Sequence, residues 1–489
     1  MMKIRSMKHK GIILITILLT VSGCRLNKPY QRPDLDEPDT FYGDGASTAE
    51  SAINPVNTYW AEFFNDSLLV SLIDTALANN IDLKIADAYV EIGLARLKQA
   101  KANFLPSVDA SPFRYRQDLF SENYNNYGSN RARRNHGPDV PTSFYTERLE
   151  YEASVALNWE LDVWGKLSSL KRARQNAYMQ TMEFRKAVQT SLIADISSTY
   201  FVLGLLKSQI AVYKDNLALN TNTLKIVNLQ FEAGEVTSLA VKQTLSQKLR
   251  AQSLIPQLER EYIRQENRLN RMLGRSGRSI ELKDLESPII DDEYVAGLPI
   301  ELLSNRPDMA AAEYELKEAY ERVGIANAMR YPSVSLGSTV GLNSMDLGKL
   351  LDPTGSGFFL VGASVFQPIF QNRKLRTNYE VAMKEKEIAE LKFKDTFLQA
   401  MNEVSNALVS IKKLKEEYVI AQERVAAAKN AVEDASFLFK SGLANYLEVI
   451  TAQTEALNSE LNLENLKMQI FTADVELYRS LGGGWEEPD

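Results

Sequence analysis

Residues 150–161 read EYEASVALNWEL, and apolar side chains occupy nearly every second position of this stretch. One face carries Tyr151, Ala153, Val155, Leu157, Trp159 and Leu161. The opposite face carries Glu150, Glu152, Ser154, Asn158 and Glu160. Such a segment suits either a half-buried sheet or a strand of a transmembrane barrel, and the alternation alone leaves both interpretations open.

A second alternating segment lies at residues 333–342. Its apolar face holds Val334, Leu336, Val340 and Leu342, opposite Ser333, Ser335, Thr339 and glycines. Two weaker segments accompany these, and the one at 357–367 is apolar on both faces, so its register stays open. We therefore predict four strands, at about 106–116, 150–161, 332–343 and 357–368.

These strands belong to a duplicated plan. Residues 231–239 read FEAGEVTSL and residues 439–447 read FKSGLANYL, at an offset of 208. Leu-Gly pairs at 273–274 and 481–482 follow at the same offset. Each copy runs helix, two strands, a very long helix, a glycine-containing turn and a returning helix. The sequence therefore predicts one architecture written twice rather than several different domains.

The long helical stretches, 166–231 and 374–440, contain no proline. At 1.5 Å per residue, each helix would be roughly 100 Å long, which favours coiled-coil packing over a compact globule. Their apolar positions are sparse and often small, as at Ala173, Ala187 and Ala427. Periodicity alone does not decide between a two-helix coiled coil in solvent and helices that touch along narrow seams with another face wet.

The first 24 residues have the features of a targeting segment. Four basic residues precede an apolar stretch at 12–20 that is too short to span a bilayer as a helix. Val21-Ser22-Gly23-Cys24 resembles the bacterial lipobox, in which the cysteine is acylated and becomes the mature N-terminus. We expect a signal peptide at 1–23, a lipid attached to Cys24 and a proline-rich tether at 24–57.

Composition argues against most enzyme classes. Cys24 is the single cysteine, and His9 and His136 are the only histidines, so disulfides, cysteine-based zinc sites and histidine-based catalysis have little to work with. The targeting segment holds four of the 56 basic residues and none of the 63 acidic ones, so the remainder carries a net charge of −11. We expect no catalytic residues, no metal, no cofactor and no nucleic-acid partner.

The chain after Cys24 lacks any apolar run of 18 residues. If it crosses a membrane, strands must do so, because only helices and closed barrels satisfy the backbone in lipid. Four strands do not close a barrel, which needs at least about eight, so two or more chains must contribute. The long polar connection at 121–141, with basic residues at Arg131, Arg133 and Arg134, is typical of an extracellular barrel loop.

Three further segments resemble a known family. These are 59–66 (YWAEFFND), 158–166 (NWELDVWGK) and 298–313 (LPIELLSNRPDMAAAE). They are similar to TolC-like outer-membrane efflux channels, in the lipoprotein branch of NodT/OprM type that serves resistance-nodulation-division pumps. The resemblance implies a mostly α protein with a transmembrane barrel portion. It implies a homotrimer in which three chains of four strands form a twelve-stranded barrel and the helices form a tunnel across the periplasm.

The resemblance and the duplication together predict the domain organisation. The expected parts are a first repeat at 58–274, a linker at 275–297, a second repeat at 298–484 and a tail at 485–489. The expected place is the outer membrane of a Gram-negative bacterium, in contact with its lipid.

The resemblance also implies site residues. The two glycine turns would meet a periplasmic adaptor (membrane fusion) protein through Gly234, Glu235, Val236, Gly442, Leu443 and Ala444. The family often has an acid just beyond the second turn that rings the constricted periplasmic entrance, and this chain has Glu448 there. A second family acid, three residues on, is replaced by Thr451, which puts the strength of any cation trap in doubt.

The expected function is a passive exit duct for substrates delivered by an inner-membrane pump of the resistance-nodulation-division type and its adaptor. One alternative is the exit duct of a type I protein secretion system. Another, from a different class, is a periplasmic coiled-coil lipoprotein with a structural or adaptor role. Adaptors would be expected to carry barrel-like β domains flanking a single hairpin, whereas this chain has the duplicated plan.

Overall fold

The computed structural model describes residues 30–35, 41, 60–64, 66–121, 145–283, 287–288 and 305–483. Cys24 with its signal peptide and the connection at 122–144 lie outside the described residues. The chain forms two compact units, and each draws on both repeats: one holds Met1–Gln31, Leu94–Asn176 and Lys317–Ile388, and the other holds Arg32–Gly93, Ala177–Leu316 and Ala389–Asp489. Over the described ranges, no helix combines the length and apolar character that a membrane span requires.

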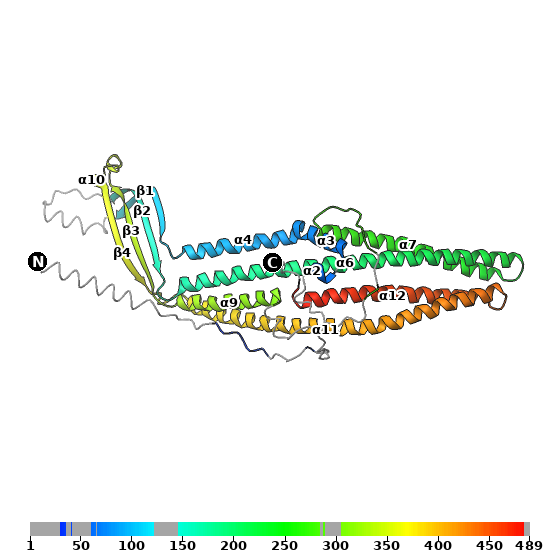
Figure 1. Cartoon of the computed structure of the whole chain (residues 1–489). Helices are drawn as coiled ribbons and strands as arrows, with labels where there is room; N and C mark the ends of the chain where they lie inside the picture. The colour runs from blue at the N-terminus through cyan, green and yellow to red at the C-terminus, as the bar shows by residue number, and fades with distance from the viewer. Residues whose placement is uncertain are drawn as a thin grey trace, which may run out of the picture. The chain divides into compact units, whose positions relative to one another are not determined.

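The first unit contains one antiparallel sheet of four strands in chain order (Figure 1). The strands are β1 (Ser107–Ser121), β2 (Tyr145–Leu161), β3 (Ser333–Ser344) and β4 (Gly357–Phe366). β1 and β2 are longer than the sequence predicts, because they stay paired through largely polar residues where the alternation fades; Asp118 lies opposite Arg148 there.

Register aligns the apolar faces of the strands. Val155 pairs with Val340 and Trp159 pairs with Leu336, so the faces predicted separately for β2 and β3 coincide. Val340 also pairs with Phe359, which settles the register of β4 and puts Phe359 on the apolar face. The sheet therefore has one continuous apolar face, since alternate residues of a strand point to opposite sides.

The opposite face of the sheet is polar along β1, β2 and β3, whereas β4 adds Phe358, Leu360 and Phe366 to it. Arg114 of β1 forms an ion pair with Glu152 of β2, and the hydroxyls of Ser335 and Ser364 lie 2.7 Å apart across β3 and β4. Among the described residues, β1 and β4 each pair on one side only. Two edges are thus left with unpaired backbone groups, which a stable sheet normally covers or pairs.

The long helices have equal lengths in the two repeats. α6 (Lys166–Glu232) and α11 (Lys374–Lys440) are 67 residues each, and α7 (Ser238–Met272) and α12 (Tyr446–Ser480) are 35 each. The remaining helices are α2 (Trp60–Phe64), α3 (Ser67–Asn79), α4 (Ile81–Ala102), α9 (Pro307–Ala328), η3 (Leu347–Lys349) and α10 (Pro353–Ser356). Pro256 lies inside α7.

The helix predicted ahead of the strands in the first repeat is interrupted at Asn80. Its ψ of 136° ends α3, and its side chain then makes two hydrogen bonds. The amide nitrogen donates to the carbonyl oxygen of Met272 at 2.8 Å, and the amide oxygen accepts from the backbone nitrogen of Leu83 at 2.9 Å. A tertiary contact with the end of α7 thus overrides a continuous helical pattern.

The main core lies in the second unit, where α2, α3 and the ends of α7 and α12 pack on α6. Trp60, Ile73, Ile196 and Leu269 are all buried there. Phe63 stacks on Tyr478 with ring centroids 4.7 Å apart. The aromatic motif near residue 60 thus fills the core.

Candidate functional site

The two turns that join the long helices have the same backbone. Gly234 has φ +80° and Gly442 has φ +74°, a region that L side chains rarely adopt. After each glycine the chain reaches back five residues, from Glu235 N to Gln230 O at 2.8 Å and from Leu443 N to Leu438 O at 2.9 Å. These are Schellman caps, which satisfy the last carbonyls of α6 and α11 before the chain reverses.

A small apolar cluster holds the two turns side by side (Figure 1). Val227 and Ala240 of the first hairpin pack on Phe439 and Val449 of the second, and all four are buried. Two of the predicted contact residues face this cluster, because Val236 and Ala444 are half-buried against it. The other four are exposed: Gly234, Glu235, Gly442 and Leu443.

Two polar contacts link the hairpins across this cluster. The hydroxyl of Tyr446 hydrogen-bonds to the side-chain oxygen of Gln243. Further along, the amide nitrogen of Gln453 donates to the hydroxyl of Thr223 at 3.0 Å, and Gln453 is only 3% exposed. No local sequence pattern indicates these pairs, because their members lie more than 200 residues apart.

Glu448 stands in the first turn of α12. The side chain of Asn445 caps this helix by accepting from Leu447 N at 2.9 Å and Glu448 N at 3.2 Å. The Asn445 amide also donates to the Glu448 carboxylate at 3.0 Å. The spacing Asn-x-x-Glu resembles a capping box, a local sequence signal from which this pair could have been predicted. The carboxylate is therefore oriented in the positive first turn while remaining exposed.

The first repeat lacks an equivalent carboxylate. The position 208 residues before Glu448 is Ala240, which is buried in the cluster between the hairpins. Thr237, the N-cap of α7, makes no side-chain capping bond. Only the second repeat thus presents an oriented acid at its turn. Thr451 donates its hydroxyl to the carbonyl of Leu447.

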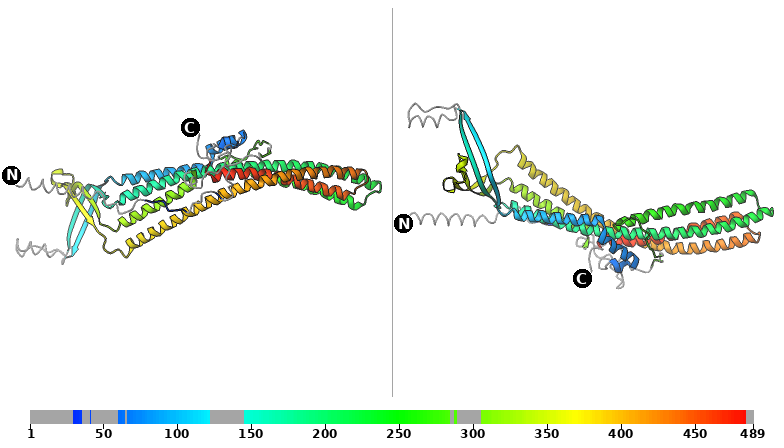
Figure 2. Two further views of the ribbon diagram at one scale, coloured as in Figure 1. Left: turned by 60° about the horizontal axis from the view of Figure 1, so that its bottom comes forward. Right: turned by 90° about the horizontal axis from the view of Figure 1, so that it is seen from above.

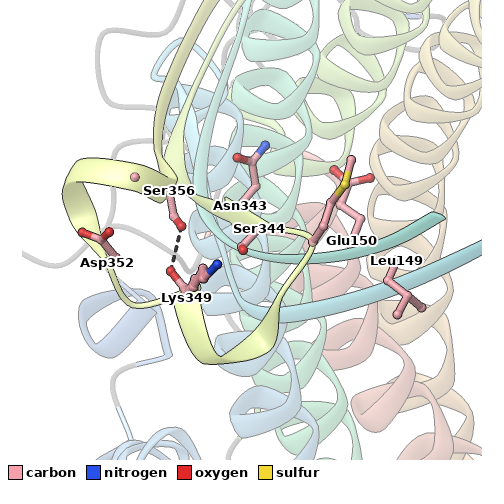
Figure 3. A pocket seen from close by; sticks show the side chains of 9 residues that line it. Leu149, Glu150, Asn343, Ser344, Lys349, Asp352 and Ser356 are labelled. Carbon is pink, nitrogen blue, oxygen red and sulfur yellow. Dashed lines mark hydrogen bonds between the residues drawn. The ribbon is translucent and has the colours of Figure 1, made fainter. Parts of the chain in front are cut away.

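Two hollows lie away from the turns. One, of about 340 Å³, is bounded by the start of β2 and the connection between β3 and β4, and has Glu150, Lys349 and Asp352 in its wall (Figure 3). The other, of about 570 Å³, lies between α4, α6 and α7 beside Asp195. Burial raises the pKa of Asp195, and Arg268 partly opposes this. Within the described part of the chain, no three His, Cys, Asp or Glu side chains gather as metal ligands do.

The duplicated helices and the four-stranded sheet find their counterpart in one family. The sequence model of outer membrane efflux proteins matches residues 72–275 and 298–483, which are the two repeats. The chain belongs to the outer membrane efflux protein family. This confirms the family predicted from segments 59–66, 158–166 and 298–313.

Relatives resemble the chain along nearly its whole length. It is 28% identical to the solvent efflux pump outer membrane protein SrpC of Pseudomonas putida over 487 residues, covering 98% of this chain and 99% of SrpC. It is 26% identical to the cation efflux system protein CusC of Escherichia coli O6:H1 over 472 residues, covering 96% and 98%. The solved CmeC outer membrane channel of Campylobacter jejuni superposes with a TM-score of 0.81 at 22% identity, covering 95% and 96%.

These similarities confirm the predicted fold class and function class. The chain is an outer-membrane efflux protein with the fold of the outer-membrane channels. Its sheet is the strand portion of that fold, and α6, α7, α11 and α12 are the long helices.

Proposed function

We propose that three copies of this chain close their sheets into a twelve-stranded barrel in the outer membrane and their helices into a tunnel across the periplasm. The observation that carries this proposal is the open sheet, which has one apolar face, an opposite face that is polar along β1, β2 and β3, and an unpaired edge on both β1 and β4. Pairing β4 of one copy with β1 of the next removes every edge, and the apolar face then meets lipid.

In this assembly the protein works as a passive duct without chemistry of its own. An inner-membrane pump supplies the energy, and a periplasmic adaptor docks at the helical turns. Leu239 and Leu443 support this docking site, because they are 58% and 76% exposed at the two turns. Large exposed apolar groups mark interaction surfaces. SrpC and CusC are named for solvents and for cations, so we propose that the partner pump selects the substrate.

The assembly is tested by its size and its conductance. Purified protein in detergent should sediment as three chains, resist dissociation by detergent until heated, and form ion-conducting pores in planar bilayers. A monomer that forms no pores would contradict the proposal and favour a periplasmic coiled-coil lipoprotein.

We propose that Glu448, repeated three times, rings the periplasmic entrance and attracts cations. Glu448→Gln keeps the shape of the side chain but removes its charge, so the cation-to-anion permeability ratio in planar bilayers should fall roughly twofold. Glu448→Ala should act similarly, and Glu448→Lys should favour anions. Glu433→Gln, an exposed acid of α11, is the control for loss of one charge per chain. Equal ratios in Glu448→Gln and wild type would refute the gate role.

The hydroxyl of Tyr446 is expected to restrain the gate by tying α12 to α7. Tyr446→Phe removes its hydrogen bond to Gln243, which is worth about 1 kcal/mol, so the open fraction of single channels should rise about fivefold. Tyr213→Phe, on a half-buried tyrosine of α6, is the matched control. If both variants open as rarely as wild type, the Tyr446 contact does not hold the hairpins together.

We propose that Cys24 carries the lipid anchor of the mature protein. Cys24→Ser should abolish labelling of the protein by radioactive palmitate in cells, while trimers still form from the strands. Mass spectrometry of the mature N-terminus gives an independent reading. Wild-type protein with an unmodified Cys24 would exclude the anchor.

A further inference from the structure

The connection from β4 into α11 exposes large apolar side chains. We call residues 367–373 the second junction; Figure 2 shows the chain turning there from β4 into α11. Ile369 is 96% exposed and Phe370 is 83% exposed. Next to them, Asn372 and Arg373 have φ values of +48° and +67°, although neither is glycine. Each such residue costs about 1–2 kcal/mol.

The equivalent connection in the first repeat is built differently. It is four residues long (162–165) where the second has seven, and its left-handed position is Gly165. Asp162 accepts from the backbone nitrogen of Leu167 at 2.7 Å and caps α6. Trp164 donates to the carbonyl of Pro332 at 2.6 Å. The second junction is held by one comparable contact, from the amide nitrogen of Gln367 to the carbonyl of Arg330 at 3.2 Å, but its Ile369 and Phe370 remain exposed.

The end of the second junction and the first turn of α11 are also basic. Arg373, Lys374 and Arg376 are exposed, and no acid occurs between residues 367 and 379. Arg373 and Arg376 share one carboxylate, that of Glu380, at 3.1 and 2.8 Å. These cations stand at the N-terminal end of α11, where the helix dipole is already positive, so they oppose the stability of the helix. An external anion would offset this repulsion.

We propose that the second junction binds the periplasmic surface of the outer membrane as an anionic phospholipid site. Phe370 and Ile369 insert at the boundary between headgroups and acyl chains, and Arg373, Lys374 and Arg376 bind the lipid phosphates. Apolar anchors beside a basic cluster are the pattern of proteins that bind membrane surfaces. The inference rests on the proposed function, since the sheet that precedes this junction must lie in the membrane.

The position of nearby aromatic side chains supports a location of the second junction at the level of the lipid headgroups. Trp159 near the end of β2 is 37% exposed, and Tyr331 before β3 is 38% exposed. Both belong to the same end of the sheet as Phe366, because Trp159 pairs with Leu336 and Ser333 pairs with Phe366. Tryptophan and tyrosine concentrate at the level of the lipid headgroups. The second junction follows Phe366 directly.

Fluorescence quenching by lipids tests the insertion. In a Cys24→Ser background, which contains no cysteine, a nitrobenzoxadiazole label is attached at Phe370→Cys, Val361→Cys or Lys394→Cys. Val361 lies on the apolar face of β4, and Lys394 is exposed on α11 about 30 Å along the helix from Lys374. The full chain is reconstituted in liposomes of phosphatidylcholine and phosphatidylglycerol with nitroxide lipids.

A nitroxide near the headgroup should quench label 370, a nitroxide deep in the acyl chain should quench label 361, and neither should quench label 394. Quenching of label 361 without label 370 overturns the inference and leaves the proposed function standing. If neither label 361 nor label 370 is quenched, both the lipid site and the proposed membrane barrel are wrong. If label 370 is shielded equally in detergent trimers, and exposed only when they dissociate, its occupant is a second copy of the chain and the lipid site is wrong.

A charge-removal series tests the phosphate contacts. In Arg373→Gln/Lys374→Gln/Arg376→Gln, binding of phosphatidylglycerol to detergent-solubilised trimers should weaken about fivefold per charge, with phosphatidylcholine unaffected. Native mass spectrometry counts the bound lipids. The control removes three other cations of α11, in Lys384→Gln/Lys394→Gln/Lys413→Gln. Equal loss in both variants, or no preference for phosphatidylglycerol in wild type, would overturn the anionic site.

Discussion

Arg306→Met should destabilise the protein by about 3 kcal/mol, because it removes a buried guanidinium and leaves two half-buried acids and a backbone carbonyl without their partner. The guanidinium of Arg306 is buried and donates to the carbonyl of Ser480 at 2.8 Å. It also pairs with Asp308 at 2.6 Å and with Glu403 at 2.9 Å. One side chain thus joins the start of α9 to α11 and to the end of α12. Guanidinium unfolding followed by circular dichroism in detergent measures the loss.

Arg424→Met is the matched control for Arg306→Met. Arg424 of α11 pairs with Glu455 of α12 at 2.6 Å, but both side chains are 52% exposed, so the variant should lose no more than about 1 kcal/mol. A loss for Arg306→Met as small as that of the control would show that the buried network is not what holds this joint.

The same network predicts that the stability of wild type and of Arg306→Met responds oppositely to pH. Burial alone would raise the pKa of Asp308, but the hydrogen bond and charge of Arg306 outweigh it and lower that pKa. In wild type the stabilisation from Asp308 is therefore present above about pH 4 and is lost as the pH falls through the lowered pKa. In Arg306→Met the half-buried carboxyl of Asp308 has lost its partner, so acidification should slightly stabilise that variant, as unfolding at pH 4 and pH 7 would show.

Gly482→Ala should cost about 3–4 kcal/mol, the second of the two largest effects. Gly482 has φ +89°, and an added Cβ would lie 2.4 Å from the carbonyl oxygen of Asn305. Both the backbone angle and the lack of space oppose a side chain at the position that follows α12. Gly274 should respond in the same way in the first repeat. Its φ is +66°, and an added Cβ there would lie 2.4 Å from the carbonyl oxygen of Asn79.

Gly442→Ala separates the two causes. Gly442 has φ +74°, but an added Cβ there would meet nothing within 4 Å, so only the backbone angle is disturbed. We expect a loss of about 1–2 kcal/mol in the same unfolding experiment. Equal losses at Gly442 and Gly482 would contradict the close approach between the end of α12 and Asn305.

The contacts at the ends of α7 and α12 recur in both repeats, but the sequence repeat reveals only part of them. Asn80 and Arg306 are 226 residues apart, and each donates to the last turn of the returning helix, at Met272 and Ser480. The repeat was visible in sequence, but the break of the first helix at Asn80 was not, because the contact that causes it comes from 192 residues away. A local sequence pattern predicts that a helix exists, but a contact with a residue far away in the sequence decides where that helix ends.

The candidate site also combines features that the sequence predicts with features that depend on tertiary packing. The glycine turns were readable, since Gly234 and Gly442 need φ values that other residues avoid. The inward packing of Val236 and Ala444 was not, because it depends on the neighbouring hairpin. The link from Tyr446 to Gln243 likewise joins two hairpins whose approach no local pattern encodes.

By itself, the sequence determined the duplication, the four strands, the long helices and the family, because each depends on local periodicity or on motifs. Only the tertiary structure decided the register that aligns the apolar faces of β2, β3 and β4, including Phe359. It also decided which side chains remain uncovered, as at Ile369 and Phe370. The physical reason is that exposure and register belong to pairs of distant segments, and such pairs exist only once the chain has folded.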